Sequence, residues 1–429
     1  MHTLYISYFG LREPLVQTQV LPYLRELRKG GVETSLLTFE PRMRREWPAA
    51  LRGSQRAELL RDGVRWHALA YHKSPSLPAT LFDVAAGTLE AARIVRRHRV
   101  DTLHARNHVP CLIGALVKRW TGASLVFDVR GFMAEEYVDA GTWPANGLLF
   151  RLTKAVERRL MDASDGFVVL TERARDVLFP GRIDRDARGR PFEVIPCCID
   201  VDRFDRRRDS SRTTTRRTLG VEGRRVVVYV GTLGGWYMTD EMAAFLAEAH
   251  RRNPATFALI LTQSPVDAIG DALRSLGVPE SAFLVQKATP GEIPGYLAAA
   301  DVALSFIRPS VSKLSSSPTK IAEYLAAGLP VVSSAGVGDV DAVIRDDRTG
   351  VLVREFAPSS FRAALDELDE LRRDPSLADR CRASARRRFD LSSIGGLRYR
   401  RLYRRLRPAP TAARSRAASS VLEVAERSS

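Results

Sequence analysis

The residues best suited to chemistry lie in one stretch, 315–332, where a hydroxyl-rich loop runs into a predicted helix. Pro318 is a favoured residue for the first turn of a helix, and Ser317 or Thr319 can cap it. Lys320 places a positive charge in that turn, where it opposes the helix dipole at a cost of about 0.3–1 kcal/mol. A residue that weakens its own helix indicates a functional demand, and helix N-termini attract anions. The pattern predicts a phosphate site formed by Ser316, Ser317, Thr319 and Lys320.

Glu323 follows Lys320 by about one helical turn on the same helix face. Its carboxylate can accept hydrogen bonds from the two hydroxyls of a ribose, as acidic residues do in dinucleotide-binding folds. Gly328 and Pro330 then end the helix before the next strand. These residues predict a nucleoside diphosphate site; the alternative is a solvent-exposed helix start with an incidental Lys and Glu.

Short β-rich runs alternate with longer amphipathic stretches, which is typical of parallel sheets covered by helices. The first half of the chain has strand candidates at Thr3–Tyr8, Glu33–Thr38, Thr102–His104, Ser124–Asp128, Gly166–Leu170 and Glu193–Pro196. The second half has them at Arg225–Val230, Phe257–Thr262, Phe283–Gln286, Val302–Phe306 and Pro330–Ser333. The predicted fold class is α/β, with two Rossmann-like doubly wound domains that face each other across a ligand-binding cleft.

A length of 429 residues suits two domains. The expected division is an N-terminal domain 1–200, a connector 201–221, a second domain 222–385, a basic helical stretch 386–406 and a disordered tail 408–429. The connector prediction rests on residues 205–215, which have no apolar face. The helical stretch has an expected apolar face of Leu397, Leu402, Tyr403 and Leu406.

The formal net charge of +16 permits binding to nucleic acid, an anionic membrane or a phosphorylated substrate. Because the excess is mostly arginine and is spread along the chain, a codon bias is a competing explanation. No apolar run approaches the ~20 residues of a membrane span, and the first residues show no secretory signal pattern. Four cysteines, Cys111, Cys197, Cys198 and Cys381, form no disulfide or zinc pattern and are expected to be buried. We therefore expect a cytoplasmic protein, with peripheral attachment to the inner face of the membrane as a further expectation.

The stretch 315–332 resembles the donor-binding helix of GT-B fold glycosyltransferases, specifically the retaining family 4 and its relatives. Four more motifs resemble that family in the same order: Asp165–Thr171, Val194–Asp200 with Phe204, Tyr229–Leu233 and Leu297–Leu304. The resemblance covers about residues 1–405. It implies two Rossmann-like domains, a final helix within 386–406 that crosses back to the N-terminal domain, and a nucleoside-diphosphate-sugar donor bound by the C-terminal half. No cofactor is implied.

The donor site departs from the family pattern at positions that normally carry charge. Ser315 stands where the family has the first Glu of a pair, so that only Glu323 remains. Thr232 stands where the family has an Arg for the β-phosphate of the donor, and the Lys that follows it in the family is absent. Lys320 is expected to replace these cations, with help from the backbone amides of Gly231 and Thr232.

In the N-terminal domain, Arg130 stands at a strand end where the family often has a histidine that points into the cleft. An arginine does not act as a base at neutral pH, but it can bind a phosphate or an acidic sugar. Asp128, Glu135 and Glu136 are the available carboxylates, and one of them is expected to supply the base if the reaction inverts configuration, whereas a retaining family member needs no protein base. A structural salt bridge between Asp128 and Arg130 is the alternative. Gly10 is expected to let the backbone approach the donor phosphates.

The residues and the resemblance together predict a glycosyltransferase of cell-envelope or exopolysaccharide synthesis, with a glycan or lipid-linked acceptor. A GT-B sugar-nucleotide epimerase and a basic nucleic-acid-binding protein are the alternatives; no nucleic acid is expected, because no recognised module for it is present. No metal is expected either, since no D-x-D triplet stands at a strand end where it could hold a diphosphate-bound divalent ion; Asp200–Asp202 has that spelling but falls in the crossover between domains. The donor base, the sugar, the acceptor and the stereochemistry stay open.

Overall fold

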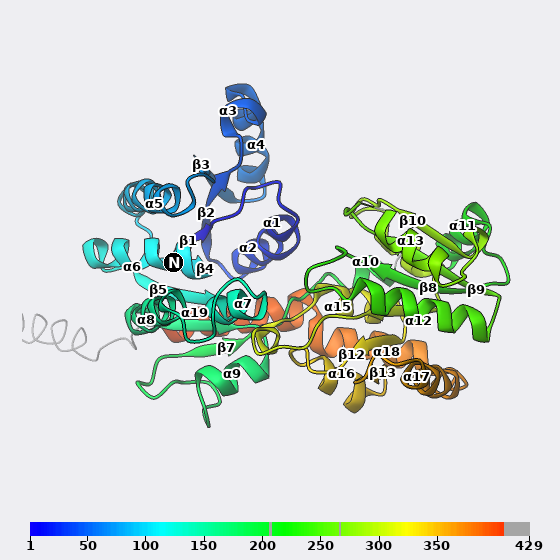
Figure 1. Cartoon of the computed structure of the whole chain (residues 1–429). Helices are drawn as coiled ribbons and strands as arrows, with labels where there is room; N and C mark the ends of the chain where they lie inside the picture. The colour runs from blue at the N-terminus through cyan, green and yellow to red at the C-terminus, as the bar shows by residue number, and fades with distance from the viewer. Residues whose placement is uncertain (206–207, 266, 407–429) are drawn as a thin grey trace, which may run out of the picture.

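The computed structural model describes residues 1–205, 208–265 and 267–406, and it contains two parallel β-sheets, each covered by helices (Figure 1). The N-terminal sheet has the strand order β3-β2-β1-β4-β5-β6-β7, and the C-terminal sheet has the order β10-β9-β8-β11-β12-β13. In both sheets the order reverses beside the first strand, and ligands bind at the carboxyl ends of strands at such switch points. The predicted fold class is confirmed.

The N-terminal sheet consists of β1 His2–Ser7, β2 Glu33–Glu40, β3 Val64–Ala70, β4 Thr102–Arg106, β5 Ser124–Val129, β6 Gly166–Val169 and β7 Phe192–Val194. The C-terminal sheet consists of β8 Arg225–Val230, β9 Thr256–Leu261, β10 Phe283–Gln286, β11 Val302–Ser305, β12 Val331–Ser334 and β13 Gly350–Val353. The strands predicted at 225–230 and 283–286 have the observed bounds. The prediction missed the edge strands β3 and β13; five of the seven residues of β3 and two of the four residues of β13 are only partly buried, so the apolar signal is weak.

The helices before the crossover are α1 Pro14–Gln19, α2 Leu21–Lys29, α3 Met43–Glu46, α4 Ala49–Arg61, α5 Ser76–His98, α6 His108–Thr121, α7 Met133–Asp139, α8 Leu148–Ala163 and α9 Glu172–Leu178. After it come α10 Asp202–Asp205, α11 Arg208–Leu219, α12 Thr239–Arg252, α13 Asp267–Ser275, α14 Ile293–Ala299, α15 Thr319–Ala326, α16 Val340–Asp347, α17 Pro358–Leu371, α18 Leu377–Phe389 and α19 Leu397–Leu406. Short 3-10 turns lie at Glu280–Ala282 and Ser312–Ser315, and a π-helical turn lies at Leu391–Gly396.

Helices cover both faces of the N-terminal sheet. Since successive side chains of a strand point to opposite faces, each strand contributes to two cores. Leu4 and Ile6 of β1 pack into the core beneath α5, α6 and α8. Tyr5, between them, packs into a second core beneath α2 and α19. Since α19 follows the C-terminal domain in the chain, the last helix completes the core of the first domain (Figure 1).

The basic stretch 386–406 divides into two parts. Helix α18 ends at Phe389 and packs against α15 in the C-terminal domain, whereas the π-helical turn, which contacts α2, and α19 return to the N-terminal domain. The hydroxyl of Tyr403 lies 2.9 Å from His104 Nδ1 and 3.0 Å from Thr3 Oγ1, which fixes α19 to the sheet. The expected apolar face is correct for Leu402 and Tyr403, but Leu397 is exposed and Tyr399 is buried in its place.

The expectation of an irregular solvated stretch at 205–215 is wrong for its second part. Residues from 208 onward form α11, which packs against α14. Arg212 and Arg216 form ion pairs with Asp301 at 2.7 and 3.2 Å. The helix is thus attached through charged side chains, which an apolar-face criterion does not detect. Residues 206–207 and the predicted tail 408–429 lie outside the described residues.

All four cysteines are free and buried, as expected.

Candidate functional site

Helix α15 presents its first turn to the seam between the two domains. Pro318 precedes it, and no side chain caps its N-terminus, so the caps expected from Ser317 and Thr319 are absent. Ser317 Oγ instead accepts a hydrogen bond from the backbone N–H of Cys197 at 3.0 Å. Thr319 Oγ1 accepts one from the side chain of Gln19 at 2.7 Å. Both hydroxyls therefore link the start of α15 to the N-terminal domain and leave the amides of the first turn without a side-chain cap.

Lys320 lies in an aromatic cage at the start of α15. Its side chain is buried, and Nζ lies 4.2 Å from the ring centre of Tyr229 and 4.4 Å from that of Tyr237. Within the described residues, the only hydrogen-bond partner of Nζ is the Tyr229 hydroxyl, at 3.2 Å. Burial lowers the pKa of Lys320 to about 7, an effect that nearby Glu323 partly offsets. An ammonium with three donors and one protein partner is a group prepared for an anion.

Gly231 makes room for this ammonium at the end of β8. Its φ is +147°, and a Cβ at this position would lie 2.5 Å from Lys320 Nζ. The Tyr229 hydroxyl donates to the Thr232 carbonyl oxygen at 2.5 Å and so holds the loop that follows. The loop folds back through bridges from Tyr237 to Gly234 and Ile307, which bring Tyr237 over Lys320.

Glu323 lines a small cavity of about 120 Å³ together with Thr319 and Arg203. Burial raises the pKa of Glu323 to about 7, although Arg203 and Lys320 oppose the shift. Lys320 and Glu323 therefore both titrate near neutral pH, which is typical of functional sites.

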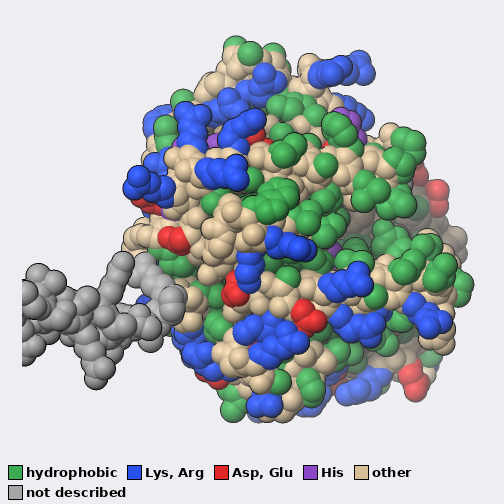
Figure 2. Space-filling model, turned by 90° about the vertical axis from the view of Figure 1, so that its left-hand side faces the viewer, with side chains coloured by type: hydrophobic (Ala, Val, Ile, Leu, Met, Phe, Trp, Pro, Cys, Tyr) green, Lys and Arg blue, Asp and Glu red, His purple; other side chains and the backbone are tan. Residues whose placement is uncertain are grey.

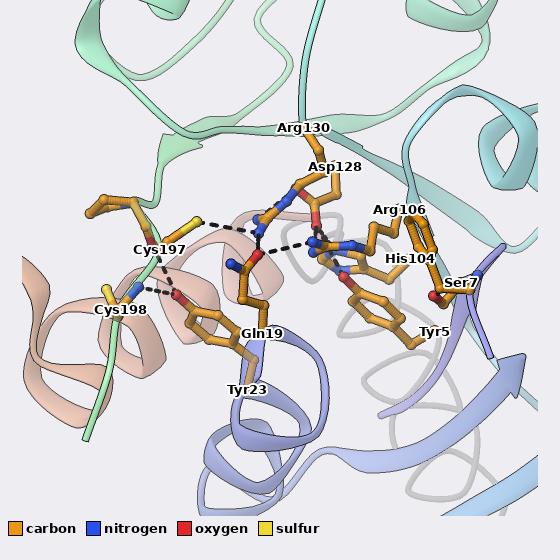
Figure 3. A network of polar contacts seen from close by, with 12 residues as sticks. Tyr5, Ser7, Gln19, Tyr23, His104, Arg106, Asp128, Arg130, Cys197 and Cys198 are labelled. Carbon is orange, nitrogen blue, oxygen red and sulfur yellow. Dashed lines mark hydrogen bonds and ion pairs between the residues drawn. The ribbon is translucent and has the colours of Figure 1, made fainter. Parts of the chain in front are cut away.

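A network of polar side chains lies at the end of the N-terminal sheet (Figure 3), and the hydrogen bond from Gln19 to Thr319 connects it to α15. Gln19 Oε1 accepts from Arg106 Nη2 at 3.0 Å and from Arg130 Nη2 at 2.7 Å. Asp128 lies behind the arginines, with Oδ1 at 3.4 Å from Arg130 Nη1 and Oδ2 at 3.1 Å from the Tyr5 hydroxyl, which donates to it. All of these side chains are buried, so the network is part of the domain seam.

A second cavity, of about 290 Å³, lies at the carboxyl ends of β1, β2 and β4. Its lining includes four aromatic residues, Tyr8, Phe9, Phe39 and Tyr71, with Arg106 as a cation. Gly10 also lines this cavity, and a Cβ there would lie 2.8 Å from Glu40 Oε2. Aromatic rings beside a few polar groups are typical of sites for sugars and other small molecules.

Comparison with known proteins identifies the two halves of this architecture. Residues 16–203 match the family Glycosyltransferase Family 4, and residues 224–370 match the family Glycosyl transferases group 1. The chain belongs to the GT-B glycosyltransferases.

Curated relatives of the transferase include the D-inositol 3-phosphate glycosyltransferases of Segniliparus rotundus and Nocardia farcinica. The first is 26% identical over 306 residues, which are 69% of this chain and 64% of the relative. The second is 29% identical over 233 residues, which are 51% of this chain and 48% of the relative. The matched segments thus span less than two thirds of either relative.

Solved structures share the fold of the transferase along almost its whole length. A glycosyltransferase from Rickettsia africae has a TM-score of 0.70 at 13% identity, with 95% of this chain and 99% of that chain covered. Anabaena Alr3699/HepE in complex with UDP has a TM-score of 0.69 at 16% identity, with 94% and 100% covered. The comparisons do not favour the epimerase or the nucleic-acid-binding protein.

The carboxylates predicted for the acceptor side of the transferase lie in different environments. Asp128 is fully buried and makes no contact with solvent, in contrast to the expected base that faces the acceptor. Burial alone would raise its pKa, but Arg130 and His104 together hold the pKa well below its usual value. The structure thus contains the salt bridge between Asp128 and Arg130 that was the alternative. Asp128 is placed to hold Arg130, not to accept a proton.

Glu135 and its neighbour Glu136 lie on α7, beside the C-terminal domain. Glu135 forms an ion pair with Lys154 at 3.0 Å and is largely buried. Glu136 is more exposed and approaches Lys313 of the other domain at 3.7 Å. Lys313 Nζ lies 3.8 Å from the ring centre of Trp236, so this second lysine also faces an aromatic residue. As a candidate base Glu136 is more accessible than Glu135, while the role predicted for Glu135 remains a prediction.

Of the predicted donor residues, the structure brings Gly231 and Lys320 into contact and places the Thr232 backbone beside them. Ser316 lies in the turn before α15, where its N–H donates to the Lys313 carbonyl. Ser315, which replaces an acidic residue of the family, is buried and donates to the Ser312 carbonyl. Sequence reasoning missed Gln19, because nothing in the short helix α1 indicates a contact 300 residues away.

Within the described ranges, no group of His, Cys, Asp and Glu side chains has the arrangement of a metal site. Nor is any described helix long and apolar enough to cross a membrane.

Proposed function

We propose that this GT-B protein transfers a sugar from a nucleoside diphosphate donor to a hydroxyl group of a lipid-linked glycan of the cell envelope. The observation that carries the donor half of this proposal is Lys320, a buried ammonium with a single protein hydrogen-bond partner at the start of α15. A diphosphate supplies the anionic oxygens that this ammonium and the uncapped amides of α15 lack.

The donor phosphates would lie between Gly231 and the first turn of α15. Backbone amides at both places and the Lys320 ammonium would offset the charge that grows on the leaving diphosphate as the sugar departs. Glu323, one turn later, is the residue we assign to the ribose hydroxyls. UDP complexes of the Anabaena protein HepE support a nucleotide donor for this fold. No protein base is assigned, because Asp128 is buried.

The acceptor would occupy the aromatic cavity at the ends of β1, β2 and β4. Rings of Tyr8 and Tyr71 suit the apolar faces of a sugar, and the cavity lies in the domain opposite the donor helix. A similar neighbour, WaaG, is a glycosyltransferase involved in lipopolysaccharide biosynthesis. These features support an envelope glycan.

A thermal-shift titration with UDP, GDP, ADP and CMP tests the donor site directly. We expect one nucleoside diphosphate to raise the melting temperature of the wild type and to have no effect on Lys320→Ala. The control is Lys29→Ala, which removes a mostly exposed lysine of the N-terminal domain. A shift of wild-type size in Lys320→Ala would contradict the phosphate assignment.

A second candidate acceptor is a small phosphorylated polyol, as the names of the curated relatives suggest. Arg106 favours it, because this buried residue lines the acceptor cavity and its Nη1 has no hydrogen-bond partner within the described residues. An assay of nucleoside diphosphate release, with alkyl glycosides, free sugars or inositol 3-phosphate as the acceptor, distinguishes the lipid-linked acceptor from the phosphorylated polyol. Turnover with alkyl glycosides above that with free sugars supports the lipid-linked acceptor; preference for inositol 3-phosphate replaces it with the polyol.

A further inference from the structure

Three helices of the N-terminal domain carry large hydrophobic side chains that point away from the core. Helix α6 packs against both α5 and α8, so the three form one layer over the sheet (Figure 1). Eight large apolar side chains of this layer are 53–72% exposed: Leu77, Leu81, Phe82, Leu89, Trp120, Leu148, Leu149 and Leu152. Exposed apolar side chains in such number on one layer mark an interaction surface.

The spacing of the leucines shows that they share one face of their helices. On α5, Leu77, Leu81 and Leu89 lie in an i, i+4 row, with exposed Ala85 between them. Leu148 and Leu152 start the same kind of row on α8. The core-facing positions of both helices are filled by other residues, so packing within the domain does not explain the leucines.

Arginines follow the exposed leucines on both helices. Arg93 and Arg97 extend the α5 row by two further turns, and the α8 helix carries Arg158 and Arg159 near its end. Among the described residues, none forms an ion pair with Arg97, Arg158 or Arg159, so these charges are uncompensated by the protein. Figure 2 faces this side of the molecule and shows hydrophobic side chains gathered among Lys and Arg. A surface that combines apolar rows with cations complements an anionic lipid surface.

The leucine-rich end of this layer adjoins the acceptor cavity. Helix α5 begins shortly after β3, at the edge of the sheet where Tyr71 lines that cavity. The ring of Phe82, one of the exposed residues, contacts the His72 ring edge-on at a centroid distance of 5.0 Å. A lipid-linked hydroxyl that approaches from this side therefore meets the apolar residues and the cavity mouth together.

We propose that the outer face of α5, α6 and α8 binds the surface of an anionic lipid bilayer. The leucine-rich ends of α5 and α8 enter the boundary between headgroups and acyl chains, and the arginines contact the headgroup phosphates. Only the benefit of this attachment, delivery of a lipid-linked acceptor, rests on the proposed function; the binding itself rests on the surface.

Co-sedimentation of the full chain with vesicles tests the proposal. We expect binding to vesicles of phosphatidylglycerol and phosphatidylcholine, and at least tenfold weaker binding to vesicles of phosphatidylcholine alone. Leu81→Ser combined with Leu152→Ser should weaken binding to the mixed vesicles at least tenfold, as should Arg97→Gln with Arg159→Gln. The matched control is Leu276→Ser, which changes an exposed leucine of the C-terminal domain.

Wild-type binding by the double leucine variant, or no binding by the wild type, overturns the proposal. So does self-association of the wild type in size-exclusion chromatography that Leu81→Ser abolishes, because the face is then a contact between copies. Because the substituted residues are exposed, the variants should keep the melting temperature of the wild type. Nucleoside diphosphate binding is measured on the same samples: its absence in the wild type, with vesicle binding intact, rejects the proposed function and leaves the docking surface in place.

Discussion

Gln19 joins the two domains through both ends of its side-chain amide. Its Nε2 donates to Thr319 Oγ1 at 2.7 Å. Its Oε1 accepts from Arg130 Nη2, a hydrogen bond of 2.7 Å that is drawn in Figure 3. A single residue of α1 thus connects the buried arginines of the N-terminal sheet to the first residue of the donor helix. Any motion of one domain relative to the other must break one of these hydrogen bonds or move the bonded side chains together.

Two substitutions of Gln19 distinguish the effect of its hydrogen bond to Thr319 from the effect of its hydrogen bond to Arg130. Gln19→Glu keeps an acceptor for the arginines but removes the N–H that reaches Thr319, so we expect a fold at least as stable and weaker donor-dependent turnover. Gln19→Ala also leaves two buried guanidinium groups with fewer partners, which should cost about 1–3 kcal/mol of unfolding free energy. Urea denaturation and steady-state kinetics on both variants measure the two effects. Equal stability in the two variants would show that the arginines do not need Gln19.

Gly231 should not tolerate a side chain. In Gly231→Ala the new methyl group meets the Lys320 ammonium, so we expect the lysine to move and the affinity for nucleoside diphosphate to fall at least tenfold. Isothermal titration calorimetry measures the affinity. Gly223→Ala is the matched control: its φ is +74° and no atom lies within 4 Å of the added Cβ, so it tests backbone strain without a clash. A similar loss of affinity in both variants would contradict the inference that the side chain at position 231 acts by displacing Lys320.

The affinity for the donor should depend on pH through Lys320, whose pKa is lowered to about 7 by burial. A diphosphate favours the ammonium, so above pH 7 the free protein must take up a proton on binding. The dissociation constant for nucleoside diphosphate should therefore rise by about tenfold per pH unit from pH 7 upward. Lys320→Arg keeps its charge throughout this range and should abolish the dependence. Calorimetry at pH 8 in buffers of different ionisation enthalpy measures the number of protons that the protein takes up when nucleoside diphosphate binds.

Glu323 should make the affinity for nucleoside diphosphate depend on pH in the direction opposite to that of Lys320. Burial raises its pKa to about 7, so below that pH the carboxyl group gains a proton and accepts hydrogen bonds from ribose less well. We expect the affinity for nucleoside diphosphate to weaken as pH falls from 7 to 5.5. Glu323→Gln should remove this dependence below pH 7 and should lower the affinity at pH 8. Unchanged affinity for the nucleoside diphosphate in Glu323→Gln would argue against the ribose assignment.

The position of Lys320 in the first turn of a helix was predictable from the sequence, where it contradicts a local rule that is visible in a single helix; its role in donor binding stays a prediction. The aromatic cage was not predictable. Tyr229 and Tyr237 meet around the lysine only because the loop after β8 folds back onto Ile307. The positions of most strands, by contrast, follow from apolar runs that each strand displays on its own; the edge strands β3 and β13 lack this signal.

The acceptor side shows why a strand-end carboxylate is easily misjudged. Asp128 comes at the end of β5, where the sequence predicts exposure at the cleft. Helix α19, which enters the same core from the far end of the chain, packs Tyr399 and Tyr403 beneath that sheet and closes off the site. Burial by a distant segment has no signature in the local pattern. Tyr71 was missed for a different reason: it follows the edge strand β3, whose partly exposed residues give a weak apolar signal.

Asp128→Asn distinguishes a structural carboxylate from a catalytic one. Without it, Arg106 and Arg130 are buried beside a neutral amide, so we expect unfolding free energy to fall by about 3–5 kcal/mol at pH 7. Because its pKa in the folded protein lies below the value of about 3.9 in unfolded chains, Asp128 contributes stability above that pH and loses it as pH falls. The difference between wild type and variant in urea denaturation should therefore shrink below pH 4.

Asp374→Asn is the control for this measurement, since Asp374 also has a lowered pKa, from hydrogen bonds to Ser376 and Arg380, but is exposed. Solvent screens such a pair, so its loss should change the unfolding curve little. An Asp128→Asn protein with wild-type stability and greatly reduced turnover would instead identify Asp128 as the base. In that case the domains must open during the reaction far enough to expose a carboxylate that the closed seam covers.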